Sequence, residues 1–180
     1  MEIVIDVPFS YAELFETAVK GIRNQNELAQ ESSEIADFWS MLQGFQTSGK
    51  CIEKAHYRIR YMKSFRPLSV KEDIEFKEAR PILYLNTAAV ASLFNSRNAG
   101  STSNRSNWST IMSYLKSHAS YLGLKQDRFT ILLPSGLPDY TIDIVNGEQV
   151  KKVKVNRPKA LCFDYLQLKE TFGLDLETEV

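Results

Sequence analysis

The stretch YTIDIVNGEQVKKVKVNR, residues 140–157, decides the fold expected for this chain. β-branched and other apolar residues fill its two halves, 140–145 and 150–155, and Asn146-Gly147 lies between them. Asn-Gly is the strongest short signal for a type I′ turn, because both central residues of that turn need a positive φ. The stretch therefore predicts a two-stranded β-ribbon.

Outward from the ribbon, apolar runs predict one further strand on each side, at 129–133 and 159–163. Asp164 is placed to cap a short last helix, and Gly173 to end it. Upstream of the first of these strands, another helix is expected over 106–118. Ser106 or Asn107 caps that helix, and its apolar positions are Trp108, Ile111, Met112 and Leu115.

The segment before this helix predicts a hairpin, a buried strand and a further helix. Residues 56–62 alternate apolar and polar side chains, as do residues 74–76, so a polar-faced hairpin is expected at about 55–80. The short apolar run 81–85 predicts a separate buried strand. A helix follows, capped by Asn86 or Thr87, with apolar positions at Ala89, Val90, Leu93 and Phe94.

Two amphipathic helices are expected at the N-terminal end. Ser10 and Glu13 form a capping box, and an apolar stripe follows, so the first helix spans about 11–28. The serine pair 32–33 offers a new N-cap, and Gly49 is placed to end the second helix in a left-handed conformation. The stripes are Tyr11, Leu14, Phe15, Ala18, Val19 and Ile22, then Ile35, Phe38, Trp39, Leu42 and Phe45.

From residue 31 onward, this order of elements is that of a winged helix with one insertion. It runs helix, inserted hairpin, short strand, helix, helix, strand, β-ribbon and strand. We therefore expect an α+β fold with N-terminal helices, an inserted β-hairpin and a winged-helix-like core over 31–176. Residues 1–30 are expected to form a strand and helix that end an upstream domain, and residues 177–180 a frayed tail.

In a helix-turn-helix pair the second helix enters the major groove of DNA, and here that helix is 106–118. Its polar face carries hydroxyl groups and a lysine, which bind phosphates or base edges, unless these are ordinary solvated positions. The polar loop 95–107 is far longer than the usual turn, so it either contacts the ligand as an insertion or the pair is not a helix-turn-helix. The candidate contacts are Arg97, Arg105, Ser109, Ser113 and Lys116.

Basic side chains crowd the second half of the ribbon and the strand after it, with no acid among them in the sequence. Acidic residues gather instead around 72–78 and in the C-terminal tail. A wing that lies along a phosphate backbone has this character. The alternative is that the lysines protect the exposed edge of a ribbon from pairing with other chains. The residues are Lys151, Lys152, Lys154, Arg157 and Lys159.

The segments FWSML (38–42), HYRI (56–59), YLK through RF (114–129) and ALCFD (160–164) span most of the chain. Together they resemble the C-terminal region of primase–helicase-type replication proteins of phages and bacterial mobile elements. In that group a winged-helix-like domain follows an ATPase core and ends in a strand and helix of the type LCFDY, residues 161–165 here. The resemblance implies DNA binding as an accessory to a helicase or primase, with no catalysis in this chain.

Composition is that of an ordinary globular chain, with 43% hydrophobic and 24% charged residues among 180. Lys and Arg number 22, as do Asp and Glu, and this zero net charge counts against a dedicated nucleic-acid binder unless charge is segregated. Cys51 and Cys162 lack ligand-spaced partners, so buried free thiols are expected. The chain lacks a signal peptide pattern and a segment long enough to span a bilayer, so we expect a cytoplasmic protein.

No complete enzyme motif is present in the sequence. GFQTSGK (44–50) fits the phosphate-binding P-loop, but Cys51 follows where Ser or Thr binds magnesium, and a helical stripe precedes it, so a helix C-terminus is expected. His56 lies in a strand pattern, and His118 lies at a helix end, where its cation meets the helix dipole favourably. Asp73, Glu75 and Glu78 are expected to be solvated. We therefore expect no catalysis, metal or cofactor.

Two functions remain open. The first is a nucleic-acid-binding accessory domain of a DNA replication protein, whose partner is DNA, single- or double-stranded, together with other replication subunits. The alternative is a protein-interaction module of a larger assembly without DNA contact. Zero net charge favours the alternative, as does a ribbon to which another chain can add a strand. Affinity for DNA that falls with salt separates the two.

Overall fold

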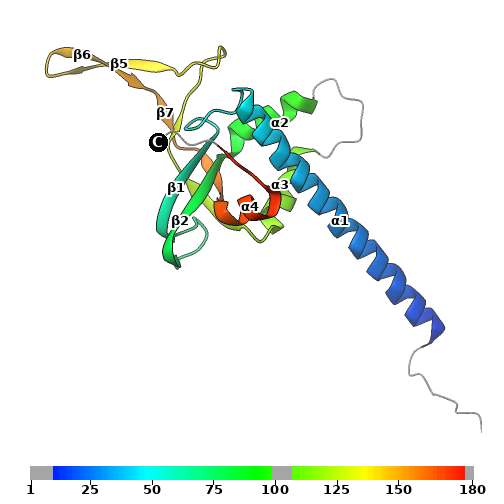
Figure 1. The fold of residues 1–180 in the computed structure, drawn as a ribbon. Helices are drawn as coiled ribbons and strands as arrows, with labels where there is room; N and C mark the ends of the chain where they lie inside the picture. The colour runs from blue at the N-terminus through cyan, green and yellow to red at the C-terminus, as the bar shows by residue number, and fades with distance from the viewer. Residues whose placement is uncertain (1–9, 99–106, 177–180) are drawn as a thin grey trace, which may run out of the picture.

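The chain folds into a four-stranded antiparallel sheet with its helices packed on one face, an α+β arrangement (Figure 1). The computed structural model describes residues 10–98 and 107–176. In spatial order the strands are β1 (Tyr57–Phe65), β2 (Ile74–Asn86), β8 (Lys159–Asp164) and β3 (Tyr121–Gln126). The helices are α1 (Tyr11–Thr47), α2 (Thr87–Asn98), α3 (Trp108–Ser117) and α4 (Tyr165–Phe172).

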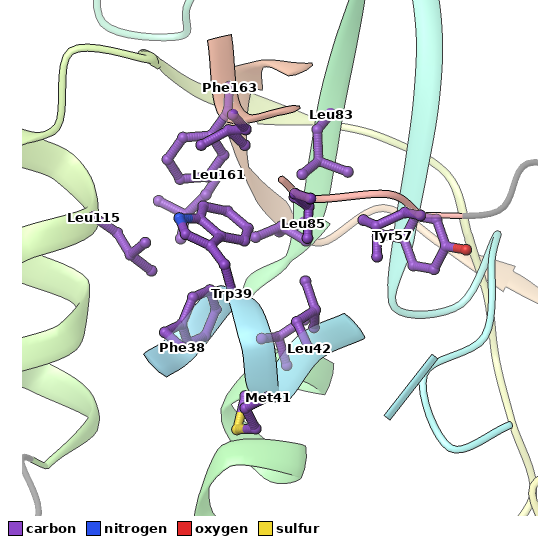
Figure 2. Close-up of a cluster of buried hydrophobic side chains, with 14 of the residues drawn as sticks. Phe38, Trp39, Met41, Leu42, Tyr57, Leu83, Leu85, Leu115, Leu161 and Phe163 are labelled. Carbon is purple, nitrogen blue, oxygen red and sulfur yellow. The ribbon is translucent and has the colours of Figure 1, made fainter. Parts of the chain in front are cut away.

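Trp39 lies at the centre of the main core, between the helices and the sheet. Its ring meets Phe163 of β8 edge-on, with ring centroids 5.3 Å apart, and meets Phe38 of α1 at 5.0 Å. Figure 2 shows Leu115 of α3 and Leu85 of β2 in the same cluster, and both are fully buried. Aromatic pairs in this geometry are worth about 1 kcal/mol beyond the area they bury, so this contact fastens α1 to the central strand.

A single helix of 37 residues, α1, replaces the two helices expected around the serine pair 32–33. The expectation of a break was wrong because neither Pro nor Gly interrupts the chain there, and serine is tolerated inside a helix. The two apolar stripes nevertheless belong to different faces. At about 100° per residue, the stripe that begins at Tyr11 lies roughly 140° around the helix from the stripe of Ile35 and Trp39.

β2 runs unbroken from Ile74 to Asn86, which corrects the prediction of a hairpin insertion followed by a separate strand at 81–85. The hairpin of β1 and β2 is therefore half of the central sheet, and the first half of β2, residues 74–80, is largely exposed. Pro81 is tolerated because β8 pairs only with residues 82–86, so the missing N–H falls outside that ladder. Residues 81–86 are buried, as expected for that apolar run.

The ribbon expected around Asn146-Gly147 is present and projects from the sheet between β3 and β8 (Figure 1). Both turn residues have positive φ, 53° and 84°, as a type I′ turn requires. Every residue of the two ribbon strands is exposed. These strands are β5 (Tyr140–Val145) and β6 (Glu148–Val153), and the shorter pair β4 (Phe129–Thr130) and β7 (Val155–Asn156) forms the base.

The end signals of the other helices are confirmed. Asn107 caps α3 and Asp164 caps α4, each through its side-chain oxygen, and Gly173 ends α4 with φ 64°. The loop expected over 95–107 begins later, because α2 continues to Asn98, and its remainder lies outside the described residues. In the described part of the chain, no helix is both long enough and apolar enough to cross a membrane.

Gly123 of β3 allows the loop after β1 to pack against the face of the sheet that the helices do not cover. Its φ is 129°, and a Cβ there would lie 2.7 Å from the Cβ of Pro67. The N–H of Leu68 donates to the carbonyl of Leu124 at 2.8 Å, which holds the loop against β3. A smaller core that includes Phe65 lies on this face.

We predict that Gly123→Ala lowers the free energy of unfolding by at least about 2 kcal/mol, because its φ is open only to glycine and the new methyl group meets Pro67. The matched change Gly44→Ala lies in α1, where a Cβ meets nothing within 4 Å. That change should raise the free energy by about 0.5–1 kcal/mol. Urea unfolding followed by tryptophan fluorescence measures both, and equal effects would contradict the prediction.

Candidate nucleic-acid interface

The exposed face of α3 carries the side chains expected from the sequence. Ser109, Ser113 and Lys116 are exposed, while Ile111 and Leu115 on the opposite face are buried. The Ser109 hydroxyl donates to the capping oxygen of Asn107 at 2.5 Å, so its donor is engaged. Within residues 10–98 and 107–176, Ser113 and Lys116 have no polar partner and are available to a ligand.

One end of this face is covered by α1. The hydroxyl of Ser117 contacts the carboxylate of Glu31 and also the carbonyl of Tyr114. The polar surface of α3 that remains open is therefore short. It reaches from the N-cap to Lys116.

The ribbon lysines are partly neutralised by acids on the opposite strand. Lys152 pairs with Asp143 at 2.9 Å, and Lys154 pairs with Asp139 at 2.8 Å. These acids are distant along the chain and meet the lysines only through the register of β5 and β6. Residues 139–159 hold five basic and three acidic side chains, an excess of two positive charges. Exposed pairs of this kind are worth about 0–1 kcal/mol, so a phosphate can displace the carboxylate.

Lys151 lies on the other face of the ribbon. Its ammonium sits 4.0 Å from the centre of the Tyr140 ring, in a cation–π contact. Ile142 and Ile144 share this face and are 66% and 76% exposed. This face of the ribbon is therefore apolar with one cation, while the opposite face carries the Lys152–Asp143 pair.

Arginines that sequence reasoning missed gather at the base of the ribbon. Arg58 of β1 donates to the carbonyl of Arg128 at 2.8 Å, and Arg60 pairs with Asp127 at 2.9 Å. Arg157 lies across from Arg128, one position beyond the last pair of the β4–β7 ladder. The signal was present in the alternation of residues 56–62, which places Arg58 and Arg60 on one face of a strand.

Not all the candidate residues meet. Arg97 lies in the last turn of α2 and lines a cleft of about 430 Å³ beside Asp37 and Lys50, so its expected place in the loop was wrong. Arg105 lies outside the described residues. Helix α2 contacts α3 and also borders a second cleft, of about 410 Å³, at the ribbon base. The face of α3 and the ribbon are thus separate surfaces joined through α2.

The P-loop-like segment 44–50 ends α1, as expected from the sequence. Ser48 is the C-cap residue, and Gly49 has φ 72°. The N–H groups of Lys50 and Cys51 donate to the carbonyl of Phe45, at 2.8 and 2.9 Å. A phosphate cradle needs such N–H groups free, and here they close the helix end instead.

Two kinds of side chain outside these surfaces, an acid of the segment 72–78 and the two cysteines, are held within the fold. Asp73 of the acidic segment pairs with Arg66. Cys51 and Cys162 are buried free thiols, as expected, and burial raises the pKa of Cys51 to about 12. In the described residues, no group of three His, Cys, Asp or Glu side chains is placed to hold a metal ion.

Both histidines accept a backbone hydrogen bond through Nδ1. Burial lowers the pKa of His56, whose Nδ1 accepts from the N–H of Ile52 at 3.0 Å. Burial also lowers the pKa of His118, whose Nδ1 accepts from the N–H of Ser120 at 3.2 Å. His118 is the C-cap residue of α3, so its expected place at a helix end is confirmed.

Comparison of the chain with protein-family models, with curated proteins and with solved structures finds no match in any of the three. The interpretation of this surface therefore depends on its own geometry and charge.

We predict that the protein loses stability as the pH falls below 6.5, the ordinary histidine pKa. Above that pH the histidines are neutral in both states. Below it the unfolded chain binds protons that the folded chain, with lowered pKa values, does not, so the free energy of unfolding falls. Urea midpoints at about pH 7.5 and about pH 5.5 measure this. The double variant His56→Gln/His118→Gln should show a smaller difference, and an unchanged one would contradict the prediction.

Proposed function

We propose that the chain is a winged-helix-like DNA-binding domain that serves as an accessory part of a replication protein of the primase–helicase type. The observation that carries the proposal is the projecting ribbon between β3 and β8, with Arg58, Arg128 and Arg157 at its base. A winged helix places its wing between two neighbouring antiparallel strands that follow the recognition helix.

The order of the elements supports this domain type. Among the described residues, three helices precede β3. β2 follows the first of these helices in the chain, and β8 lies between β2 and β3 in the sheet. β1 is an addition at the edge. In this arrangement α3 takes the place of the recognition helix, with Ser113 and Lys116 on its open face.

The basic side chains of the ribbon and its base determine which part of the protein contacts the DNA backbone. The basic residues of the ribbon and its base contact phosphates, and the lysine–aspartate pairs exchange their carboxylates for phosphate oxygens. Side chains of α3 then reach a groove or the adjoining backbone. With roughly four phosphates neutralised, the slope of log affinity against log salt is about −3.6 on duplex DNA.

A protein-docking module is the second candidate, and a specific observation favours it. Ile142 and Ile144 lie open on one face of the ribbon, and two of the lysines already have acidic partners. An exposed two-stranded ribbon is also a place where a further strand adds through main-chain hydrogen bonds. In that case the ribbon binds protein and the arginines at its base are solvated.

Fluorescence anisotropy with labelled single-stranded, duplex and forked DNA tests the proposal. We predict that Lys151→Glu/Arg157→Glu weakens binding roughly 10- to 100-fold at low salt and reduces the salt slope by about two, because two phosphate contacts are lost. The control Lys77→Glu makes one of the same reversals at the exposed far end of the β1–β2 hairpin and should leave affinity within about twofold.

Losses that are equal for each charge reversed in the ribbon variant and in the control would show that only total charge matters, and would remove the ribbon from the interface. An unaltered protein that binds none of the three DNA forms at low salt would contradict DNA binding. That second result would favour the docking module.

A further inference from the structure

The first half of α1 extends beyond the body of the protein (Figure 1). From Tyr11 to Gln30, every side chain except that of Val19 is exposed, and the buried part of the helix begins only at Ile35. Five of the exposed side chains are large and apolar: Tyr11 is 86% exposed, Leu14 50%, Phe15 62%, Ile22 59% and Leu28 63%. This half of the helix therefore holds no part of the core.

The exposed half is sharply amphipathic. At about 100° per residue, Tyr11, Leu14, Phe15, Ala18 and Ile22 fall within an arc of roughly 100°. The charged residues of the same segment, Glu13, Glu16, Lys20, Arg23 and Glu27, fall on the opposite side of the helix. The apolar arc thus contains no charge at all. It also points away from the face that carries Ile35 and Trp39, so the body of the protein cannot cover it.

An isolated helix of this length is marginal in water, and Gly21 weakens it further by about 1 kcal/mol. Its apolar face therefore gains most from a partner that covers it. The partner surface must be uncharged and apolar. It must also be about five helical turns long or less, because Glu31 contacts Ser117 of α3 and so marks where the body of the protein begins.

We propose that the apolar arc of α1 binds the same arc of a second copy of this chain, as an antiparallel helix pair centred on Ala18. The pattern about Ala18 is self-complementary. Leu14 and Ile22 lie four residues on either side of it, and Phe15 and Gly21 lie three residues on either side. In the antiparallel pair, Leu14 therefore meets Ile22 of the second copy, and Phe15 meets Gly21, whose missing side chain leaves room for the ring.

The length of the exposed segment fits this register. When the two helices overlap about Ala18, Tyr11 of one copy lies beside Gln25 of the other. Glu31 and the body of the protein then lie outside the overlap. The two bodies then lie at opposite ends of the pair and do not collide. A symmetric contact of this kind closes as a dimer and does not extend into a filament.

The buried area predicts a weak dimer. The exposed parts of Tyr11 and Phe15 remove roughly 300 Å² per copy from water. With Leu14 and Ile22 added, a symmetric pair buries on the order of 1,000 Å² in total, which is the low end of specific interfaces. Interfaces at this end of the range are commonly weak, and we expect a dissociation constant that is roughly micromolar. This proposal does not depend on DNA binding.

Sedimentation equilibrium of the full chain tests the proposal. The unaltered protein should shift from monomer to dimer over a roughly micromolar range of concentration. Leu14→Glu/Ile22→Glu should raise the dissociation constant at least about 100-fold, because it buries charge in the pair. The control Glu16→Lys/Lys20→Glu exchanges charges on the opposite face and should leave the dissociation constant unchanged. Equal near-ultraviolet circular dichroism spectra would show that the body around Trp39 is intact in both variants.

A monomer at every concentration would overturn the proposal and leave the arc to a different protein. A dimer that survives Leu14→Glu/Ile22→Glu would overturn it as well, since another surface would then form the contact.

Cysteine cross-linking tests the register, because both native cysteines are buried. Ala18→Cys should form a disulfide-linked dimer under mild oxidation, because the two copies of this residue meet at the symmetry axis. Tyr11→Cys should not, because in the antiparallel pair the two copies of Tyr11 lie far apart. Cross-linking at both positions would indicate a parallel pair and would overturn the antiparallel register.

Discussion

The contact between Trp39 and Phe163 is the constraint on which the rest of the structure depends. It joins the second half of α1 to β8, and β8 is the strand that lies between the two halves of the sheet. β8 occupies this place only because the chain returns after the ribbon and inserts between β2 and β3. The long helix, the hairpin of β1 and β2, and the ribbon are therefore all held by the packing of one tryptophan against one central strand.

Local chemistry was enough to predict the features that few residues determine. A type I′ turn requires positive φ at two positions, and Asn146 and Gly147 both accept it, so the place of the ribbon could be predicted from two residues. The caps at Asn107 and Asp164 are of the same kind. The continuity of α1 and β2 could not be predicted this way. Each of these elements has a buried half and an exposed half. The pattern of apolar residues changes where the core ends, although the helix or strand continues.

The charges of the ribbon show the same limit. Along the sequence, Lys152 and Lys154 have no acidic neighbour, and only the register of β5 and β6 brings Asp143 and Asp139 to them. The arginines at the ribbon base come from segments 70 residues apart, since Arg58 bonds to the carbonyl of Arg128. A run of like charges in a sequence therefore indicates a basic surface only after the strand opposite has been placed.

The zero net charge of the chain conceals a segregation that bears on both proposals. Residues 11–47, which form α1, hold six acidic and two basic side chains, while residues 139–159 hold five basic and three acidic ones. A phosphate backbone repels the first segment and attracts the second, so an approaching nucleic acid meets the ribbon and its base before it meets the helix. The charged side of α1 faces outward when its apolar arc is paired. Residues 11–25, which overlap in the pair, hold two acidic and two basic side chains. Pairing through α1 would thus leave two ribbons free and would add no net charge at the centre of the dimer.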